Sequence, residues 1–261
     1  MSLSTAGLAD ELFVALDSVA PSVPLFSARW PDMSIDQAYA VSLGVLERRV
    51  ARGERLTGKK IGLTAEAIQQ ALGISEPDFG FLTDAMEVAD GATVEIARHL
   101  RTPMIEAEIA FVLKHGLPAG GVTAEQVLAA TDYVTACFEI VDTRFDTQRI
   151  RIVDTVADNA SSAQYVLGRN RVDPRAIDLA AVHCTVQCNN AQVAEGTGAA
   201  VMGNSLNSVA WLANRLGAYG VTLDAGDVVL PGSMIPFLPA RPGDSFRADM
   251  GALGTVAVAF A

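Results

Sequence analysis

Three glutamates interrupt runs of apolar residues that have the composition of buried β-strands. Glu106 and Glu108 lie in the run 105–113, and Glu139 lies in the run 136–141. Side chains alternate between the two faces of a strand, so Glu106 and Glu108 share one face and the apolar residues around them share the other. Two carboxylates about 4 Å apart repel by roughly 4 kcal/mol at an effective dielectric constant near 20. Buried carboxylates need partners, so the sequence predicts that these three converge on a hard divalent cation.

A second interpretation of the acidic residues remains open at this point. A Glu-x-Glu pair is also typical of an edge strand with one solvated face, because acids are usually exposed. Glu139 argues against it, because this residue stands alone in the run 134–141, which has the pattern of a central strand. Three oxygen ligands with open positions suit Mg²⁺, or Mn²⁺ as a substitute, with water or substrate completing an octahedron.

Composition narrows the class of partner. The chain has 261 residues, half of them hydrophobic, which is enough for one large domain or a domain with a smaller N-terminal layer. The net charge of −11 argues against nucleic acid and anionic membranes as partners, because such binding needs a basic face. A small anionic substrate stays compatible, because a bound cation reverses the local field. The 19% content of charged residues is low and fits a homo-oligomer that buries part of its surface.

Cysteine usage and the absence of targeting patterns predict a cytoplasmic location. The chain has three cysteines, a small and odd number that argues against a disulfide framework and fits a reducing compartment. The first residues lack the basic region of a signal peptide. No run of about 18 apolar residues occurs, so we expect no transmembrane helix.

The order of patterns predicts an α+β fold. The first 55 residues have helical patterns, including a Ser34–Gln37 capping box that opens a helix running to about Arg52. A short strand is expected at 58–63, followed by a helix from Thr64 to about Gly73. We therefore expect an N-terminal helical region, 1–85, packed on a β-rich body, 86–261, as one integrated domain.

Strand-like runs dominate the body, with a few helices between them. A second capping box begins at Thr123, Asn189–Asn190 has hairpin-turn character, and Asn204–Leu216 is an amphipathic helix. The expected strands are 93–97, 105–113, 133–142, 181–188, 192–196, 227–230 and 255–260. No glycine-rich phosphate-binding motif follows a strand, so a nucleotide site is not indicated.

Other candidate residues for chemistry have plain structural alternatives. Lys59 and Lys60 occupy opposite faces of the short strand, so one of them should point inward, where it could hold an anion or transfer a proton. Asp78 lies in Pro-Asp-Phe-Gly, which is typical of a turn stabilised by an aspartate side chain. The polar stretch 158–162 is either a loop or helix cap, or a set of short groups that orient a substrate.

Several segments together resemble the 2-keto-4-pentenoate hydratase family, also called 2-hydroxypenta-2,4-dienoate hydratases, of the fumarylacetoacetate hydrolase superfamily. Each motif is weak alone, but the set is collinear from about residue 35 to the C-terminus. The segments are Lys60-Ile-Gly-Leu-Thr64, Pro77-Asp78-Phe-Gly80, Ile105-Glu106-Ala-Glu108-Ile-Ala110, Glu139-Ile-Val-Asp142, Ala157-Asp-Asn-Ala-Ser-Ser162, Asn207-Ser-Val-Ala-Trp-Leu-Ala213 and Leu230-Pro-Gly-Ser233.

The resemblance implies a fold, a cofactor and a set of site residues. The fold is a β-roll or distorted barrel with N-terminal helices. The metal is usually Mg²⁺, held by residues that match Glu106, Glu108 and Glu139 here. Lys60 and Asp78 match the lysine and the aspartate of two motifs of the family, and the serine-rich stretch lines the site in relatives, with Ser161 as the member we select.

The implied reaction is metal-dependent addition of water to a 2-hydroxy-2,4-dienoate, through its 2-oxo-3-enoate tautomer. The product is a 4-hydroxy-2-oxo acid, formed during meta-cleavage catabolism of aromatic compounds. The alternative in the same family is a 2-oxo-3-hexenedioate (4-oxalocrotonate) decarboxylase, whose substrate tail carries an extra carboxylate that Arg144, Arg149 or Arg151 could reach. An alternative from another class is a non-catalytic subunit that binds a pathway enzyme.

Overall fold

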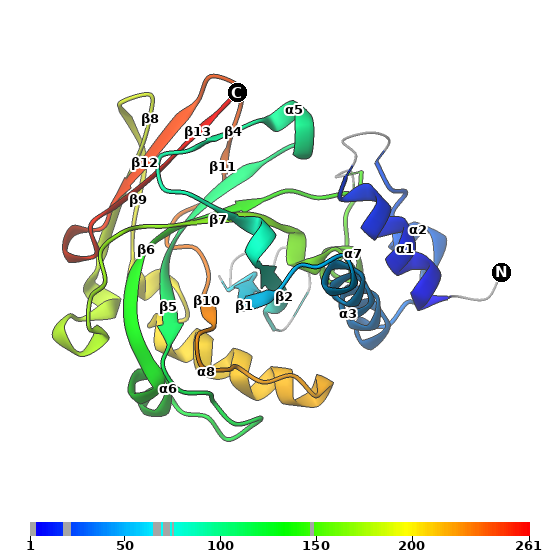
Figure 1. Ribbon diagram of the computed structural model, residues 1–261, viewed down its shortest axis with the longest axis horizontal. Helices are drawn as coiled ribbons and strands as arrows, with labels where there is room; N and C mark the ends of the chain where they lie inside the picture. Colours follow the sequence, from blue (N-terminus) through cyan, green and yellow to red (C-terminus); the bar gives the residue numbers. More distant parts are fainter. Residues whose placement is uncertain (1–3, 18–21, 65–68, 70–73, 75, 147–148) are drawn as a thin grey trace.

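The chain folds as a curled, largely antiparallel sheet with N-terminal helices on one side (Figure 1). The computed structural model describes residues 4–17, 22–64, 69, 74, 76–146 and 149–261. The α-helices are α1 Thr5–Ala15, α2 Phe26–Arg29, α3 Ile35–Ala51, α5 Ile96–His99, α6 Ala124–Ala130, α7 Ile152–Ala157 and α8 Ser205–Leu216. The strands are β1 Leu56–Gly62, β2 Asp78–Thr83, β3 Glu87–Val88, β4 Thr93–Val94, β5 Met104–Leu113, β6 Thr131–Val141, β7 Ser162–Leu167, β8 His183–Cys188, β9 Ala191–Thr197, β10 Val228–Leu230, β11 Leu238–Pro239, β12 Ser245–Asp249 and β13 Thr255–Phe260. Within the described ranges, no helix combines the length and apolar character needed to cross a membrane.

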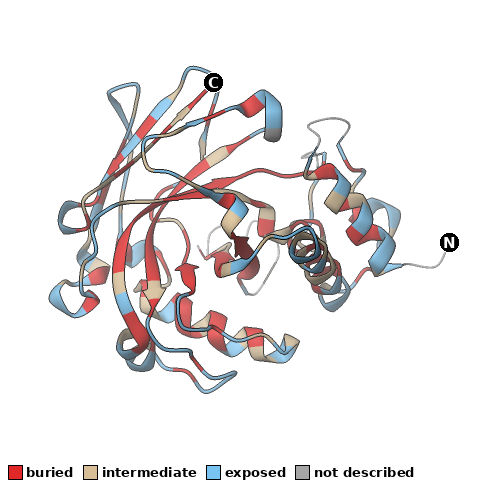
Figure 2. Ribbon diagram, in the orientation of Figure 1, coloured by how far each residue is buried: buried red, intermediate tan, exposed pale blue. Residues whose placement is uncertain are grey.

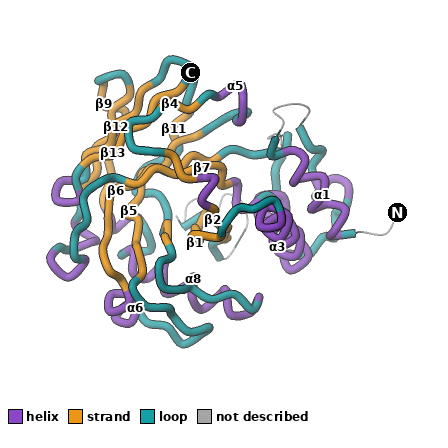
Figure 3. Tube along the Cα trace, in the orientation of Figure 1, coloured by secondary structure: helices purple, strands orange, loops and turns teal. Residues whose placement is uncertain are grey.

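Two sheets make up the β-rich part of the protein. The larger has eight strands in the order β2-β1-β10-β5-β6-β7-β3, with β11 also paired to β5. The smaller has five strands in the order β4-β13-β12-β8-β9. Figure 3 shows the strands gathered together, with α1 and α3 beside them and α8 running along another side. The arrangement confirms the predicted α+β class with a β-rich roll.

The long β5–β6 hairpin forms the centre of the larger sheet and has two different faces. Its register places Glu106 directly opposite Glu139. The alternate residues of β5 that point away from these glutamates are fully buried in the main hydrophobic core: Ile105, Ala107, Ile109 and Phe111. Burying each large side chain of this kind contributes about 1.5–3 kcal/mol. Figure 2 shows burial along most of both strands, so the glutamate face is also shielded from water.

Local sequence signals fix the ends of the helices. The Ser34 hydroxyl accepts a hydrogen bond from the Gln37 amide at 3.2 Å, and the Gln37 side chain accepts one from the Ser34 amide at 2.9 Å. Thr123 forms the same reciprocal pair at the start of α6, and Asn204 caps α8. These capping hydrogen bonds satisfy backbone amide groups of the first helical turn that have no partner within the helix. Both predicted capping boxes are therefore confirmed.

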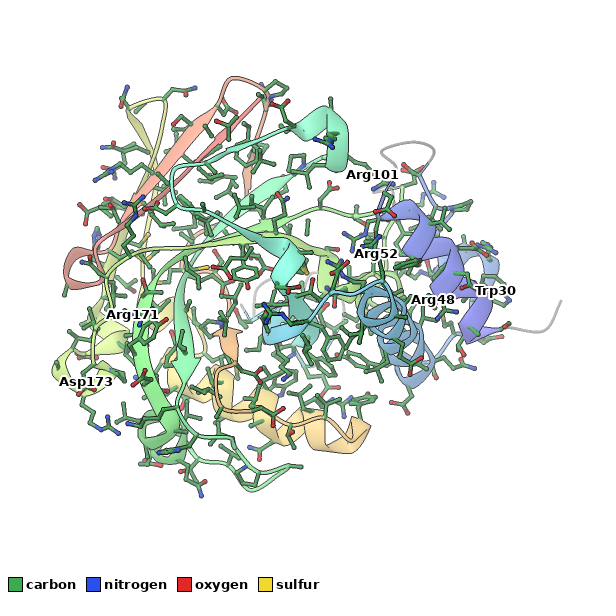
Figure 4. All side chains as sticks on the ribbon, in the orientation of Figure 1. Trp30, Arg48, Arg52, Arg101, Arg171 and Asp173 are labelled. Carbon is green, nitrogen blue, oxygen red and sulfur yellow. The ribbon has the colours of Figure 1, made fainter. Side chains whose placement is uncertain are left out.

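Ion pairs join α3 to the segment around α1. Arg48 contacts Asp10 at 2.6 Å, and Arg52 contacts Asp17 at 2.8 Å. Figure 4 labels both arginines; Arg48 lies in α3, and Arg52 directly follows its last residue. Pairs of this kind lie at the surface and contribute at most about 1 kcal/mol each. The apolar contacts beneath them, rather than these charges, hold the helical layer together.

Some expected elements differ from the structure. The strand expected at 93–97 ends at Val94, because β4 has only the two residues that pair with β13, and α5 begins at Ile96. The helix expected from Thr64 to Gly73 lies mostly outside the described residues. The boundary between 1–85 and 86–261 stays a prediction, although β1 and β2 from its N-terminal side join the same sheet as β5 and β6.

A buried ion pair connects β1 to the turn before β10. The Lys59 ammonium contacts Asp227 at 2.6 Å, and the Asp224 amide donates to the same carboxylate oxygen at 2.7 Å. Lys59 is 1% exposed and Asp227 6%. Both Lys59 and Lys60 are therefore buried, whereas the sequence required only one of them to point inward. Each lysine has its own carboxylate partner, on its own face of the strand.

Replacing Lys59 with Met should lower the free energy of unfolding by about 3–5 kcal/mol, because Asp227 would be left buried without its counter-charge. Urea denaturation followed by circular dichroism measures this difference. The double variant Lys59→Met/Asp227→Asn removes the stranded charge and should recover much of the loss. A loss below about 1 kcal/mol for the single variant would contradict a structural role for the pair.

Candidate active site

The three glutamates converge on one face of the larger sheet. Glu106 and Glu139 are opposite one another across β5 and β6, and Glu108 follows two residues along on the same face. One carboxylate oxygen from each residue lies within 4.8 Å of the corresponding oxygens of the other two. Glu108 and Glu139 are completely buried, and Glu106 is 8% exposed. The alternative of a solvated edge strand is therefore wrong.

Protein groups satisfy only part of this cluster. The Gly232 amide donates to Glu108 Oε2 at 2.8 Å, and the Ser162 hydroxyl donates to Glu139 Oε1 at 2.7 Å. Glu108 Oε1 and Glu139 Oε2 are buried and accept no hydrogen bond from any residue that the structure describes. Buried polar atoms without a partner are rare in native proteins and call for a missing group. The two orphaned oxygens therefore mark a place where another positively charged or donating group belongs.

Electrostatics support the same conclusion. Burial, followed by the charge of Glu139, raises the pKa of Glu106 to about 8. Burial and the charges of Glu139 and Glu106 also raise the pKa of Glu108 well above its usual range. Without a cation, at least part of the cluster therefore retains protons at neutral pH. Three carboxylates with free oxygens form a hard donor set, so these residues fit a divalent ion such as Mg²⁺ or Mn²⁺.

Lys60 adds a positive charge beside the carboxylates. Its ammonium lies 3.3 Å from Glu139 Oε1 and donates to the Ala160 carbonyl at 3.1 Å. Burial lowers the pKa of this lysine, but the charges of Glu139 and Glu106 outweigh burial, and the net effect is a raised pKa. Lys60 therefore places a positive charge at the edge of the cluster.

Asp78 lies in β2 beside Lys60 and not in a turn. The turn predicted from Pro-Asp-Phe-Gly is wrong, because Asp78 pairs with Gly62 in a regular antiparallel ladder between β1 and β2. Its side chain is buried, and Oδ1 has no hydrogen-bond partner among the described residues. Burial raises the pKa of this carboxyl, partly offset by Lys60. A Cβ on Gly62 would lie 2.3 Å from Asp78 Oδ1, so only glycine leaves space for the carboxyl group.

A left-handed turn at 159–161 connects these groups. Asn159, Ala160 and Ser161 have φ values of 59°, 49° and 56°, an unfavourable conformation for residues other than glycine. The Asn159 side chain stabilises the turn by accepting from the Phe81 amide at 2.7 Å and donating to the Phe81 carbonyl at 2.9 Å. The turn therefore holds the Ala160 carbonyl against the ammonium group of β1.

The serine-rich stretch contributes through two different residues. Ser161, selected from the sequence, uses its backbone: its amide donates to the Asp158 carbonyl and its carbonyl accepts from the Asp142 amide. The neighbouring Ser162 places its hydroxyl on Glu139. Sequence reasoning missed Ser162, and only the pairing of β7 with β6, which is not visible in the sequence, distinguishes the two serines.

Arg144 clamps the start of this turn. Its Nε donates to Asp158 Oδ1 at 2.5 Å, and its Nη2 donates to the Asp158 carbonyl at 2.6 Å. The guanidinium also donates to the carbonyls of Asp142 and Ser162. Arg144 is 4% exposed, and its guanidinium is bonded to Asp158 and to the Asp142 and Ser162 carbonyls, so this arginine is a structural clamp of the turn.

Comparisons with known proteins agree with this geometry. Residues 58–261 match the family described as fumarylacetoacetate (FAA) hydrolase C-terminal. The chain is 47% identical over 250 residues to a 2-hydroxyhexa-2,4-dienoate hydratase from Comamonas testosteroni, covering 95% of this chain and 94% of the relative. It is 42% identical over 252 residues to a 2-keto-4-pentenoate hydratase from Paraburkholderia xenovorans, covering 97% and 93% of the two chains.

A solved structure shares the whole fold. It is 4-oxalocrotonate decarboxylase from Pseudomonas putida G7, complexed with magnesium and adipate, with a TM-score of 0.96 and 33% identity, covering 100% of this chain and 99% of that one. The same decarboxylase complexed with calcium and acetate gives a TM-score of 0.94. The match at 58–261 and the identities above show that the chain belongs to the fumarylacetoacetate hydrolase superfamily, in its 2-keto-4-pentenoate hydratase family.

Proposed function

We propose that the protein is a metal-dependent hydratase of 2-hydroxy-2,4-dienoates that acts in meta-cleavage catabolism of aromatic compounds. It would add water through the 2-oxo-3-enoate tautomer and release a 4-hydroxy-2-oxo acid. The observation that carries the proposal is the buried trio of carboxylates with two unpartnered oxygens beside a buried lysine. The names of the relatives, hydratases of this substrate class at 42–47% identity, support the reaction type.

Glu106, Glu108 and Glu139 would hold the metal, for which we propose Mg²⁺ with Mn²⁺ as a substitute. Such an ion, when bound, supplies Lewis-acid stabilisation of the negative charge that develops on the C2 oxygen of the substrate. Gly232 and Ser162 orient two of the three carboxylates through hydrogen bonds. Groups that orient metal ligands in this way typically account for 10–100-fold in affinity or activity.

Asp78 and Lys60 are the proposed catalytic residues. Burial raises the pKa of Asp78, and its carboxyl lies beside Lys60, which suits a role in the proton transfer to C5 during ketonisation. Lys60 keeps its charge and attracts the anionic end of the substrate. Water then adds its oxygen to C4 and a proton to C3, and the same two residues position that water. General acid–base catalysis of this kind contributes about 10²–10⁴-fold in rate.

A decarboxylase remains the second candidate, because the structure with a TM-score of 0.96 is a decarboxylase. Both reactions would use the same three carboxylates and would stabilise negative charge on the C2 oxygen, so the product distinguishes the hydratase from the decarboxylase. We also propose a cytoplasmic location, a homo-oligomer and association with a pathway enzyme. The oligomer is supported by the low content of charged residues, 19%.

Purified protein with Mg²⁺ should remove the dienol absorbance of 2-hydroxypenta-2,4-dienoate and form a hydroxylated keto acid. With 4-oxalocrotonate it should release little CO₂. The Glu106→Gln variant should lose at least about 10²-fold in kcat while remaining folded, because it loses a charged ligand at unchanged size. Release of CO₂ as the main reaction would favour the decarboxylase, and no metal-dependent reaction with either substrate would favour the non-catalytic subunit.

Metal-free protein should lose stability as the pH rises from about 5 to 8. Glu106, with a pKa near 8 when folded against an ordinary 4.5, keeps a proton that the unfolded chain has lost, so each increase in pH favours unfolding. The loss should be on the order of a few kcal/mol, measured by urea denaturation in EDTA. Mg²⁺ should restore stability at pH 8, and Glu106→Gln should flatten the profile. An equally steep dependence of stability on pH in Glu106→Gln would contradict the attribution of this dependence to Glu106.

Paired serine variants test the two roles in the turn. Ser162→Ala should weaken activation by Mg²⁺ about 10–100-fold, because Glu139 loses the donor that orients it. Ser161→Ala should leave the Mg²⁺ concentration for half-activation unchanged and raise KM, if its hydroxyl contacts the substrate as the family resemblance implies. Initial rates over a Mg²⁺ titration separate these effects. Identical behaviour of the two variants would contradict the division of roles.

A further inference from the structure

The buried face of α8 carries two serines. Ser205 and Ser208 are completely buried, in the same helix as the core residues Val209 and Leu212. A buried hydroxyl group costs free energy unless it forms a hydrogen bond, and a serine inside a helix can bond a carbonyl of its own preceding turn. The Ser208 hydroxyl instead donates to the Pro231 carbonyl at 2.5 Å. This hydrogen bond ties α8 to the segment that directly follows β10.

The bonded carbonyl belongs to the peptide group that contacts Glu108. The Pro231 carbonyl and the Gly232 amide are the two polar ends of one planar peptide group, and this amide donates to Glu108 Oε2 at 2.8 Å. The C=O and N–H of a trans peptide point in opposite directions, so Ser208 and Glu108 bond to this group from opposite sides. The hydroxyl on α8 is therefore linked to the carboxylate cluster through a single rigid unit.

The backbone on either side of this peptide group does not fix its orientation. Turning the peptide plane changes ψ of Pro231 and φ of Gly232, and proline restricts only its own φ while glycine is permissive at φ. Gly232 has a φ of 118°, and a Cβ on it would lie 2.4 Å from the Thr64 hydroxyl oxygen, so this position requires glycine. The orientation of the plane therefore depends on the hydrogen bonds at its two ends.

We propose that Ser208 is a positioning residue for the metal: its hydroxyl aligns the Pro231–Gly232 peptide group, which holds the Glu108 carboxylate in the orientation that binds the ion. This rests on the proposed function, in which Glu108 is a metal ligand. A hydrogen bond to the carbonyl also polarises the peptide group and strengthens its N–H as a donor. Oε2 of Glu108 is thus tied to the protein, whereas Oε1, which has no partner among the described residues, is available to a cation.

The affinity for Mg²⁺, measured by isothermal titration calorimetry without substrate, tests the proposal. Ser208→Ala removes the hydroxyl at a position where alanine favours the helix, and it should raise Kd for Mg²⁺ about tenfold, the lower end of the effect of groups that orient metal ligands. Ser205→Ala is the matched control, because it removes a buried hydroxyl from α8 that has no hydrogen-bond partner among the described residues. This control should leave Kd unchanged. Ser208→Cys keeps the size with a weaker donor and should also raise Kd, which preserves the comparison if Ser208→Ala does not fold.

The outcomes separate positioning from a merely structural role and from the hydratase proposal. Urea denaturation in EDTA measures the stability of each metal-free variant; a Ser208→Ala protein that is less stable but has an unchanged Kd would overturn the proposal. An equal rise in Kd for Ser205→Ala would also overturn it. If no dienoate reacts but Ser208→Ala alone weakens Mg²⁺ binding, the hydratase proposal fails and the role of Ser208 stands. If the wild-type protein binds neither Mg²⁺ nor Mn²⁺, the metal site and the role of Ser208 fail together.

Discussion

The burial of three carboxylates around one ammonium group is the constraint on which the site depends. Glu106, Glu108 and Glu139 carry more negative charge than Lys60 can balance, and the sheet keeps water away from them. Such a cluster must bind protons or bind a cation, because isolated charges in a protein interior are too costly. The apolar face of the same hairpin packs into the core and holds both strands in place, so the carboxylates cannot move into water to reduce their repulsion.

A short strained segment keeps the parts of the site in register. The left-handed turn at 159–161 is bonded to β2 through Asn159, to Lys60 through the Ala160 carbonyl, and is followed by the serine that contacts Glu139. Strained backbone persists only where surrounding contacts determine it. Here Arg144 and its buried carboxylate partner supply those contacts. This one turn thus fixes the position of β2, of the Lys60 ammonium and of the Glu139 carboxylate relative to one another.

The sequence predicts those parts of the site that depend on the alternation of side chains along a single strand. The shared face of Glu106 and Glu108, and the burial of Glu139, follow from period-two alternation and the cost of burying acids. The composition of Pro-Asp-Phe-Gly predicts a turn at Asp78, but pairing of β2 with β1 makes this residue part of a strand. Ser162 was missed for a similar reason, because its contact depends on how β7 registers against β6. Local patterns do not contain such pairings.

Lys59 and Lys60 are neighbours in β1, and each ammonium group meets its own carboxylate, Asp227 or Glu139. Sliding β1 by one residue would put one lysine in the place of the other, so one ion pair could form again, but the second lysine and the other carboxylate would be buried without a counter-charge. The observed register lets both carboxylates meet an ammonium group at the same time. The two adjacent lysines therefore favour a single alignment of β1, and the Lys59–Asp227 pair helps to fix the position of Lys60 beside Glu139.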